Sequence, residues 1–113
     1  MNDRRMNNDP ESQSASARRI IDLLAAYVSR GAAAFEVEHG SGALQVVEEI
    51  MAALMGQLEG NLGHVVLWEQ FLRTPDEVSE ALVGVVEVLL CRSTVLRAWM
   101  DDAWMRYRAC AGE

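Results

Sequence analysis

The residues of this sequence that could do chemistry are two histidines, two cysteines and a serine flanked by glycines. His39 follows Glu36 and Glu38 in the stretch EVEH, and an imidazole with carboxylates can hold a metal ion. In an extended segment, alternate side chains point to opposite sides, so His39 would face away from both glutamates. We therefore interpret this stretch as a solvated loop.

The glycine-flanked serine, Ser41, lies in the stretch HGSG, which resembles a fragment of a nucleophile elbow. That elbow needs a glycine two residues before the serine, where this chain has His39. A phosphate-binding loop needs a lysine, and the chain has none. His64 has Glu59 and Glu69 five residues away on either side, a spacing that places them poorly for a shared ligand.

The two cysteines, Cys91 and Cys110, lie far apart and match no metal or redox spacing. Cys91 would need a histidine and a carboxylate within reach to act as a nucleophile. It lies in the most apolar segment of the chain, so we expect it to be a small buried hydrophobe. Because no set of ionisable residues converges, the sequence predicts no enzyme, no cofactor and no metal site.

Charge limits the possible partners. The formal net charge is −7, and residues 31–90 carry ten carboxylates against one arginine, Arg73, a net charge of −9. Such a segment repels phosphate, so we expect no nucleic-acid binding. No apolar stretch is long enough to cross a bilayer, so we expect no membrane partner. Two free thiols without a signal peptide predict a cytoplasmic protein.

Apolar residues recur at helical spacing along most of the chain, which predicts an all-α fold, a compact bundle of about five helices. Residues 1–13 are polar and unpatterned, so we expect a disordered tail before a single helical domain over 14–113. The first helix is expected to begin near Ser14 or Ser16. The others are expected at about 43–59, 62–72, 76–90 and 93–109, with a short extended piece near Phe35. The last two helices could also form one bent helix.

The helix over 76–90 has the clearest start. Thr74 can cap it, Pro75 suits its first position, and Glu77 completes a capping box. Its polar positions then form one narrow stripe, Glu77, Glu80, Gly84 and Glu87, and every other position over 78–90 except Ser79 is apolar. A surface helix buries much less of its circumference than this pattern implies. We therefore expect a second protein chain to cover part of it.

The three tryptophans help to locate the surface that a second protein chain would cover. Trp68 is expected in the core, whereas Trp99 and Trp104 are five residues apart and point in different directions on a helix. The sequence thus predicts a non-enzymatic protein-interaction domain, either a homo-oligomer or an adaptor. Its expected interface residues are Val78, Leu82, Val85, Leu89, Leu96, Trp99, Met100 and Trp104. The alternative is a helical bundle whose Met and Trp side chains line a cavity for a small apolar ligand.

Overall fold

The computed structural model describes residues 10–111 of the chain. In this range it contains six helices and no strand: α2 (Pro10–Arg30), α3 (Ala32–His39), α4 (Ser41–Leu58), α5 (Leu62–Arg73), α6 (Pro75–Arg92) and α7 (Thr94–Cys110). The predicted all-α fold is confirmed, with one helix more than expected. Helix α2 begins at Pro10 rather than near Ser14 or Ser16. Of the tail expected over 1–13, residues 1–9 lie outside the described range.

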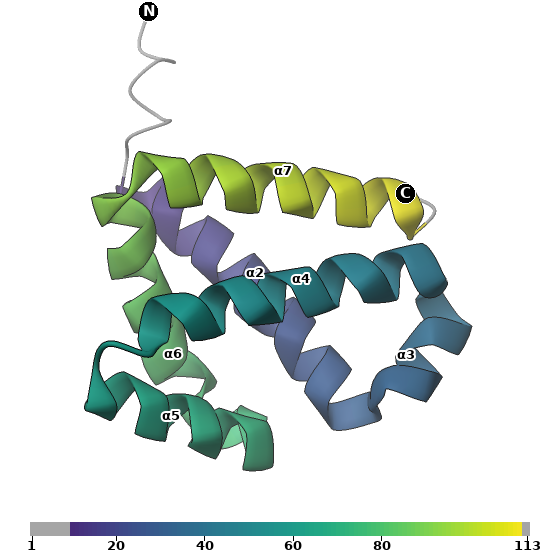
Figure 1. Cartoon of the computed structure of the whole chain (residues 1–113), viewed down its shortest axis with the longest axis horizontal. Coiled ribbons are helices and arrows are strands. Elements are labelled where there is room, and N and C mark those ends of the chain that lie inside the picture. The colour runs from purple at the N-terminus through teal and green to yellow at the C-terminus, as the bar shows by residue number, and fades with distance from the viewer. Residues whose placement is uncertain (1–9, 112–113) are drawn as a thin grey trace, which may run out of the picture.

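The helices form two layers. Helix α4 lies between α7 and α5 across one face of the molecule, and α2 and α6 pass behind them, while α3 joins α2 to α4 at one end (Figure 1). Helices α4 and α7 are antiparallel: Cys110 at the end of α7 lies against Gly42 at the start of α4, and Ser93 before α7 lines the same groove as Gln57 near the end of α4. Helix α6 packs against α2, α5 and α7, and in the described part of the chain no helix covers its outer side.

The core lies between these layers. The largest side chains that are fully buried include Phe35, Phe71, Ile50, Leu54 and Leu90. Helix α6 contributes Leu82, Val83, Val86 and Leu90, which recur at helical spacing and therefore share one side of the helix. Burial of each such side chain contributes roughly 1.5–3 kcal/mol. The opposite side of α6 is not buried in the core, and we call it the outer side.

The extended piece expected near Phe35 is wrong, because residues 32–39 form helix α3. Gly31 and Gly40 flank this helix with φ values of 89° and 97°, a region that glycine enters without strain. The chain therefore changes direction sharply before and after α3. No strand lies among the described residues to pair with an extended segment, whereas a helix satisfies its own backbone groups. Phe35 anchors α3 in the core, edge-on to the ring of Tyr27 at 5.7 Å.

The boundary predicted at Thr74 and Pro75 is confirmed, but the capping box is not formed. Thr74 ends α5 as well as starting α6, and its hydroxyl donates to the Gln70 carbonyl at 3.2 Å instead of capping α6. A second break separates α6 from α7 as two helices. There the Ser93 hydroxyl accepts from the Leu96 backbone N–H at 3.1 Å, which satisfies one free donor of the new helix.

Arginines near the two ends of the chain pair with carboxylates of its acidic middle. Arg18 of α2 pairs with Glu80 of α6 at 2.7 Å, and Arg106 pairs with Glu49 at 3.1 Å. Arg106 also pairs with Asp102 one turn earlier, as the sequence predicts. The first two contacts join neighbouring helices of one layer, α2 to α6 and α7 to α4, at the surface, where each contributes at most about 1 kcal/mol.

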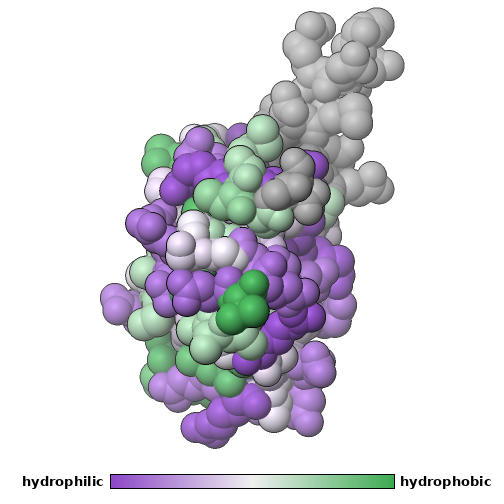
Figure 2. Space-filling model, turned by 90° about the vertical axis from the view of Figure 1, so that its right-hand side faces the viewer, coloured by the Kyte–Doolittle hydropathy of each residue, from purple (hydrophilic) through white to green (hydrophobic). Residues whose placement is uncertain are grey.

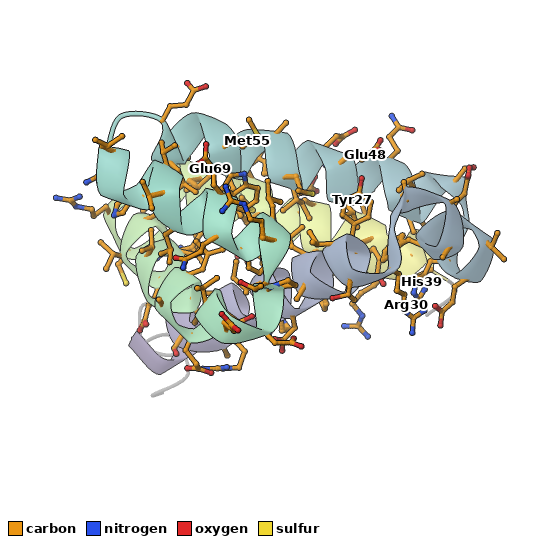
Figure 3. The ribbon with its side chains drawn as sticks, turned by 90° about the horizontal axis from the view of Figure 1, so that it is seen from below. Tyr27, Arg30, His39, Glu48, Met55 and Glu69 are labelled. Carbon is orange, nitrogen blue, oxygen red and sulfur yellow. The ribbon has the colours of Figure 1, made fainter. Side chains whose placement is uncertain are left out.

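The α3 end of the molecule gathers several aromatic and polar groups. Figure 3 shows Tyr27 pointing toward Glu48, and the hydroxyl lies 3.5 Å from the carboxylate. Burial raises the pKa of Tyr27, and the charge of Glu48 raises it further. His39 lies against Phe35, with ring centroids 4.6 Å apart, and close to the ion pair of Arg30 with Glu38. The solvated loop expected around His39 is therefore wrong, because His39 ends helix α3 and packs against an aromatic cluster.

Candidate functional site

Of the residues weighed as possible ligands or nucleophiles, His39, Ser41 and Cys110 lie toward the same end of the molecule, whereas His64 and Cys91 lie on α5 and α6. Across the described residues, no group of three or more His, Cys, Asp or Glu side chains is placed to hold a metal ion. Cys91 was expected to be buried, but it lies on the outer side of α6 and is exposed, as is Cys110. That error arose because the apolar segment around Cys91 is covered on one side only. None of the described helices is long and apolar enough to span a membrane.

The eight residues expected at an interface fall in different places. Leu82, Leu96 and Met100 are buried in the core of this chain. Val78 is partly buried and packs against that core. Trp104 is also partly buried, stacked on Tyr107, with the Arg19 guanidinium 5.5 Å from its ring. These five side chains are therefore engaged within the chain itself.

Trp99 lies in a groove between α4 and α7. Its side chain is 36% exposed, and the neighbouring Val95 is more exposed still. The groove has a volume of about 260 Å³, and Ala53 and Gln57 of α4 form its other wall. Trp99 is thus the most exposed of the expected interface residues, as its direction on the helix indicates.

Val85 and Leu89 line a larger groove, of about 470 Å³, along the outer side of α6. We call it the α6 groove; its lining residues are Asn61, His64, Ala81, Gly84, Val85, Val88, Leu89 and Arg92. Ala81, Gly84 and Val88 recur every three or four residues, so they form one continuous strip of the helix surface. A Cβ atom added to Gly84 would meet nothing within 4 Å, which shows that the floor is open.

The outer strip of α6 is apolar in its middle and charged near its two ends. Val88 is 52% exposed in the middle of it. Glu77 and Arg92 lie exposed near its two ends, and neither forms an ion pair within the described part of the chain. Glu80 differs, because a hydrogen bond from Arg18, followed by the charge of Arg18, lowers the pKa of its carboxyl group. The outer strip of α6 therefore carries one unpaired charge of each sign, of which Arg92 lines the groove and Glu77 lies beyond it.

Helix α5 contributes exposed apolar residues that the sequence analysis did not assign to an interface. Leu62 begins α5, next to Asn61 in the wall of the α6 groove, and is 80% exposed. Val66 and Leu72 are also exposed, as is Met55 of α4. One signal was present, since the predicted helix over 62–72 carries more apolar residues than one buried side can hold.

Between α4 and α5 lies a smaller hollow of about 220 Å³, which we call the α4–α5 hollow. Its lining residues are Met55, Leu58, Glu59, Val65, Trp68, Glu69 and Leu72. Trp68 is 5% exposed, as expected for a core residue, and it stacks on Phe71. Its indole Nε1–H is buried and meets no acceptor among the described residues. The hollow is thus apolar with two carboxylates, and the unpaired indole N–H lies beneath its surface.

At the end of the molecule near α3, a hollow of about 300 Å³ lies between the first half of α4 and the end of α7, with Glu49 and Arg106 among its lining residues. Viewed from that end, hydrophobic residues are broken into small areas between hydrophilic ones (Figure 2). Val37 of α3 is 88% exposed, and neither the α6 groove nor the α4–α5 hollow includes it. Isolated exposed apolar residues of this kind are ordinary. Val37 therefore serves as a control position for the grooves.

Comparison of the chain with protein-family models, with curated proteins and with solved structures gave no match. Its function is therefore inferred from the chemistry of its own surface.

Proposed function

We propose that this chain is a non-enzymatic helical interaction domain that pairs with a second copy of itself through the α6 groove. The observation that carries the proposal is the outer strip of α6, which is uncovered and complementary to itself. In an antiparallel crossing of two α6 helices, centred between Gly84 and Val85, every residue of the strip meets a suitable residue of the second copy.

At the centre, large residues face small ones. Val85 of one copy lies against Gly84 of the second copy, and the two-fold axis repeats this contact. One turn further out, Val88 faces the second copy's Ala81. Glycine and alanine leave room for the facing valines, so the two helices can approach at a shallow crossing angle. Val88, half exposed in one chain, becomes covered in the pair.

At the ends, opposite charges meet. The same antiparallel register brings Glu77 of one copy to Arg92 of the second, and Arg92 of the first to Glu77 of the second. Both side chains are exposed and unpaired within the described part of a single chain. Exposed pairs contribute only about 0.2–1 kcal/mol each. Their larger effect is to select the antiparallel orientation, since a parallel pair would place like charges together.

The flank of the groove adds apolar area. Leu62 lies at the first turn of α5, beside the groove wall formed by Asn61. In the proposed pair it extends the contact beyond α6 onto the second copy. Full burial of one such side chain contributes roughly 1.5–3 kcal/mol, so covering Leu62, Val85 and Val88 in both copies favours association.

Sedimentation equilibrium over a concentration series tests this proposal. The wild-type chain is expected to approach twice its 12.5 kDa mass. Glu77→Arg and Arg92→Glu each place like charges together, so each is expected to shift the protein toward monomer. The double reversal restores opposite charges and is expected to restore pairing. Glu36→Arg, the same charge change on exposed α3, is the control and is expected to leave pairing intact.

Circular dichroism establishes that each variant keeps its helices, since the reversals also disturb the charges at the ends of α6. A wild-type chain that stays at 12.5 kDa at all concentrations would refute self-association. A double reversal that pairs no better than either single variant would refute the antiparallel register.

A further inference from the structure

A second groove begins where the α6 groove ends. It lies between α4 and α7 with a volume of about 260 Å³, and we call it the Trp99 groove; its lining residues are Ala53, Gln57, Ser93, Val95, Leu96 and Trp99. Arg92 lines the α6 groove, and the next residue, Ser93, lines the Trp99 groove. Both grooves therefore lie on the side of the molecule where α6 passes into α7, beside the turn from α4 to α5 (Figure 1).

The Trp99 groove is largely apolar and uncovered. Val95 at its mouth is 79% exposed, and Trp99 is 36% exposed. In the part of the chain that the structure describes, no ring or guanidinium stacks on Trp99. Trp104 on the same helix differs, because the Arg19 guanidinium lies 5.5 Å from its ring. Since a guanidinium is attracted to the face of an indole, the uncovered Trp99 suits an arginine.

The end of α5 carries an arginine without a partner. Arg73 is the last residue of α5 and the only arginine or lysine between positions 31 and 90. It is exposed, and its side chain forms no ion pair with another described residue. Arginine is enriched at protein interfaces, where its planar group stacks on aromatic rings and donates several hydrogen bonds.

The antiparallel register of the two α6 helices brings this arginine to the Trp99 groove of the second copy. In that register Glu77 lies opposite the second copy's Arg92. Arg73 precedes Glu77 by four residues, about one helical turn. Val95 follows Arg92 by three residues, so the α5–α6 turn of one copy reaches the mouth of the second copy's Trp99 groove. The two-fold axis repeats the contact at the other end of the pair.

We propose that Arg73 of each copy enters the Trp99 groove of the second copy and stacks on the indole. The guanidinium lies over Trp99, and one of its N–H groups donates to the side-chain oxygen of Gln57 on the opposite wall. The apolar stem of the arginine covers Val95. This inference rests on the proposed pairing through α6, and it extends that interface to a groove that the α6 contact leaves open.

A double-mutant cycle measured by sedimentation equilibrium tests the contact. Arg73→Ala and Trp99→Leu are each expected to lower the association constant of the full chain by roughly 5–50-fold, because two contacts are lost in every pair. The double variant is expected to pair about as weakly as Trp99→Leu alone, since no contact is left for the arginine change to remove. Arg73→Lys keeps the charge without the planar group and is expected to recover only part of the loss.

Arg108→Ala is the matched control for the loss of one positive charge. Arg108 is also exposed in the last turn of a helix and forms no ion pair with another described residue, so its variant should pair like the wild type. Arg73 is exposed at a helix end, so Arg73→Ala tests the contact even if Trp99→Leu disturbs folding. Isotope-filtered NMR of an equal mixture of labelled and unlabelled chains should show contacts between the Arg73 stem of one copy and the Trp99 ring of the second.

The outcomes separate this contact from the α6 pairing on which it rests. If the wild type pairs and the double reversal of Glu77 and Arg92 restores pairing, an unchanged association constant for Arg73→Ala would overturn the contact and leave the α6 pairing standing. Losses that multiply in the double variant would show that Arg73 and Trp99 act separately, which also overturns it. A wild-type chain that stays monomeric would refute both the α6 pairing and the contact.

Discussion

Replacing Gly84 by leucine should affect the folding of one chain and the pairing of two chains in opposite directions. Gly84 lies within α6, is exposed, and has open space where a side chain would begin. Glycine inside a helix is less favourable than a good helix former by roughly 0.5–1 kcal/mol. In a single chain, Gly84→Leu is therefore expected to raise the free energy of unfolding by about that amount.

In the proposed pair, the new leucine occupies the space into which the second copy's Val85 packs. Overpacking a tight contact costs typically 1–3 kcal/mol, and the two-fold axis repeats the contact. With about 1.5 kcal/mol lost at each of the two contacts, the association constant should fall by roughly two orders of magnitude. The variant should thus be a more stable monomer.

Two measurements check this expectation. Urea unfolding at a concentration where the chain is monomeric gives the free energy of unfolding, and sedimentation equilibrium gives the association constant. Gly56→Leu is the matched control, because Gly56 also lies exposed within a helix and an added Cβ atom there would meet nothing within 4 Å. It should show the same gain in stability with no change in pairing.

Two results would contradict the expected behaviour of Gly84→Leu. One concerns where the two copies meet, and the other concerns the space at the floor of the groove. If the variant pairs as tightly as the wild type while its single chain is stabilised, the copies do not meet at the α6 groove. If the single chain is destabilised instead, whereas Gly56→Leu is stabilised, the floor of the groove is not open.

Three further predictions follow from exposure, burial and titration. Val88→Ser is expected to weaken pairing by roughly 10- to 100-fold, because about half of the valine is still uncovered in one chain and both copies lose this contact, whereas Val37→Ser should leave the association constant unchanged in the same sedimentation assay. Leu82→Ala is expected to lower the free energy of unfolding by about 2–5 kcal/mol in urea titrations, since Leu82 is fully buried; a loss below about 1 kcal/mol would contradict its place in the core. The raised pKa of Tyr27 means that its contribution to stability is complete below the usual pKa of 10.0 and is lost as pH rises through the higher folded value. Unfolding of Tyr27→Phe should therefore be less sensitive to alkaline pH than that of the wild type, and equal sensitivity would contradict this assignment.

The sequence was sufficient for the features that depend on neighbouring residues. Helical periodicity predicted an all-α fold, and proline after a capping residue predicted where α6 begins. The pairing of Asp102 with Arg106 also follows from spacing along one helix. The confirmed features are local properties, since each involves residues within about one turn of one another.

The tertiary structure decided which apolar residues remain uncovered. Leu82 and Leu62 look equally apolar in the sequence, yet Leu82 is fully buried in the core and Leu62 is 80% exposed. Periodicity identifies residues that share a side of a helix, but another helix, distant in sequence, determines whether that side is covered. For the same reason Cys91 and Gly84 lie outside, and the surplus of apolar residues on α6 becomes a groove.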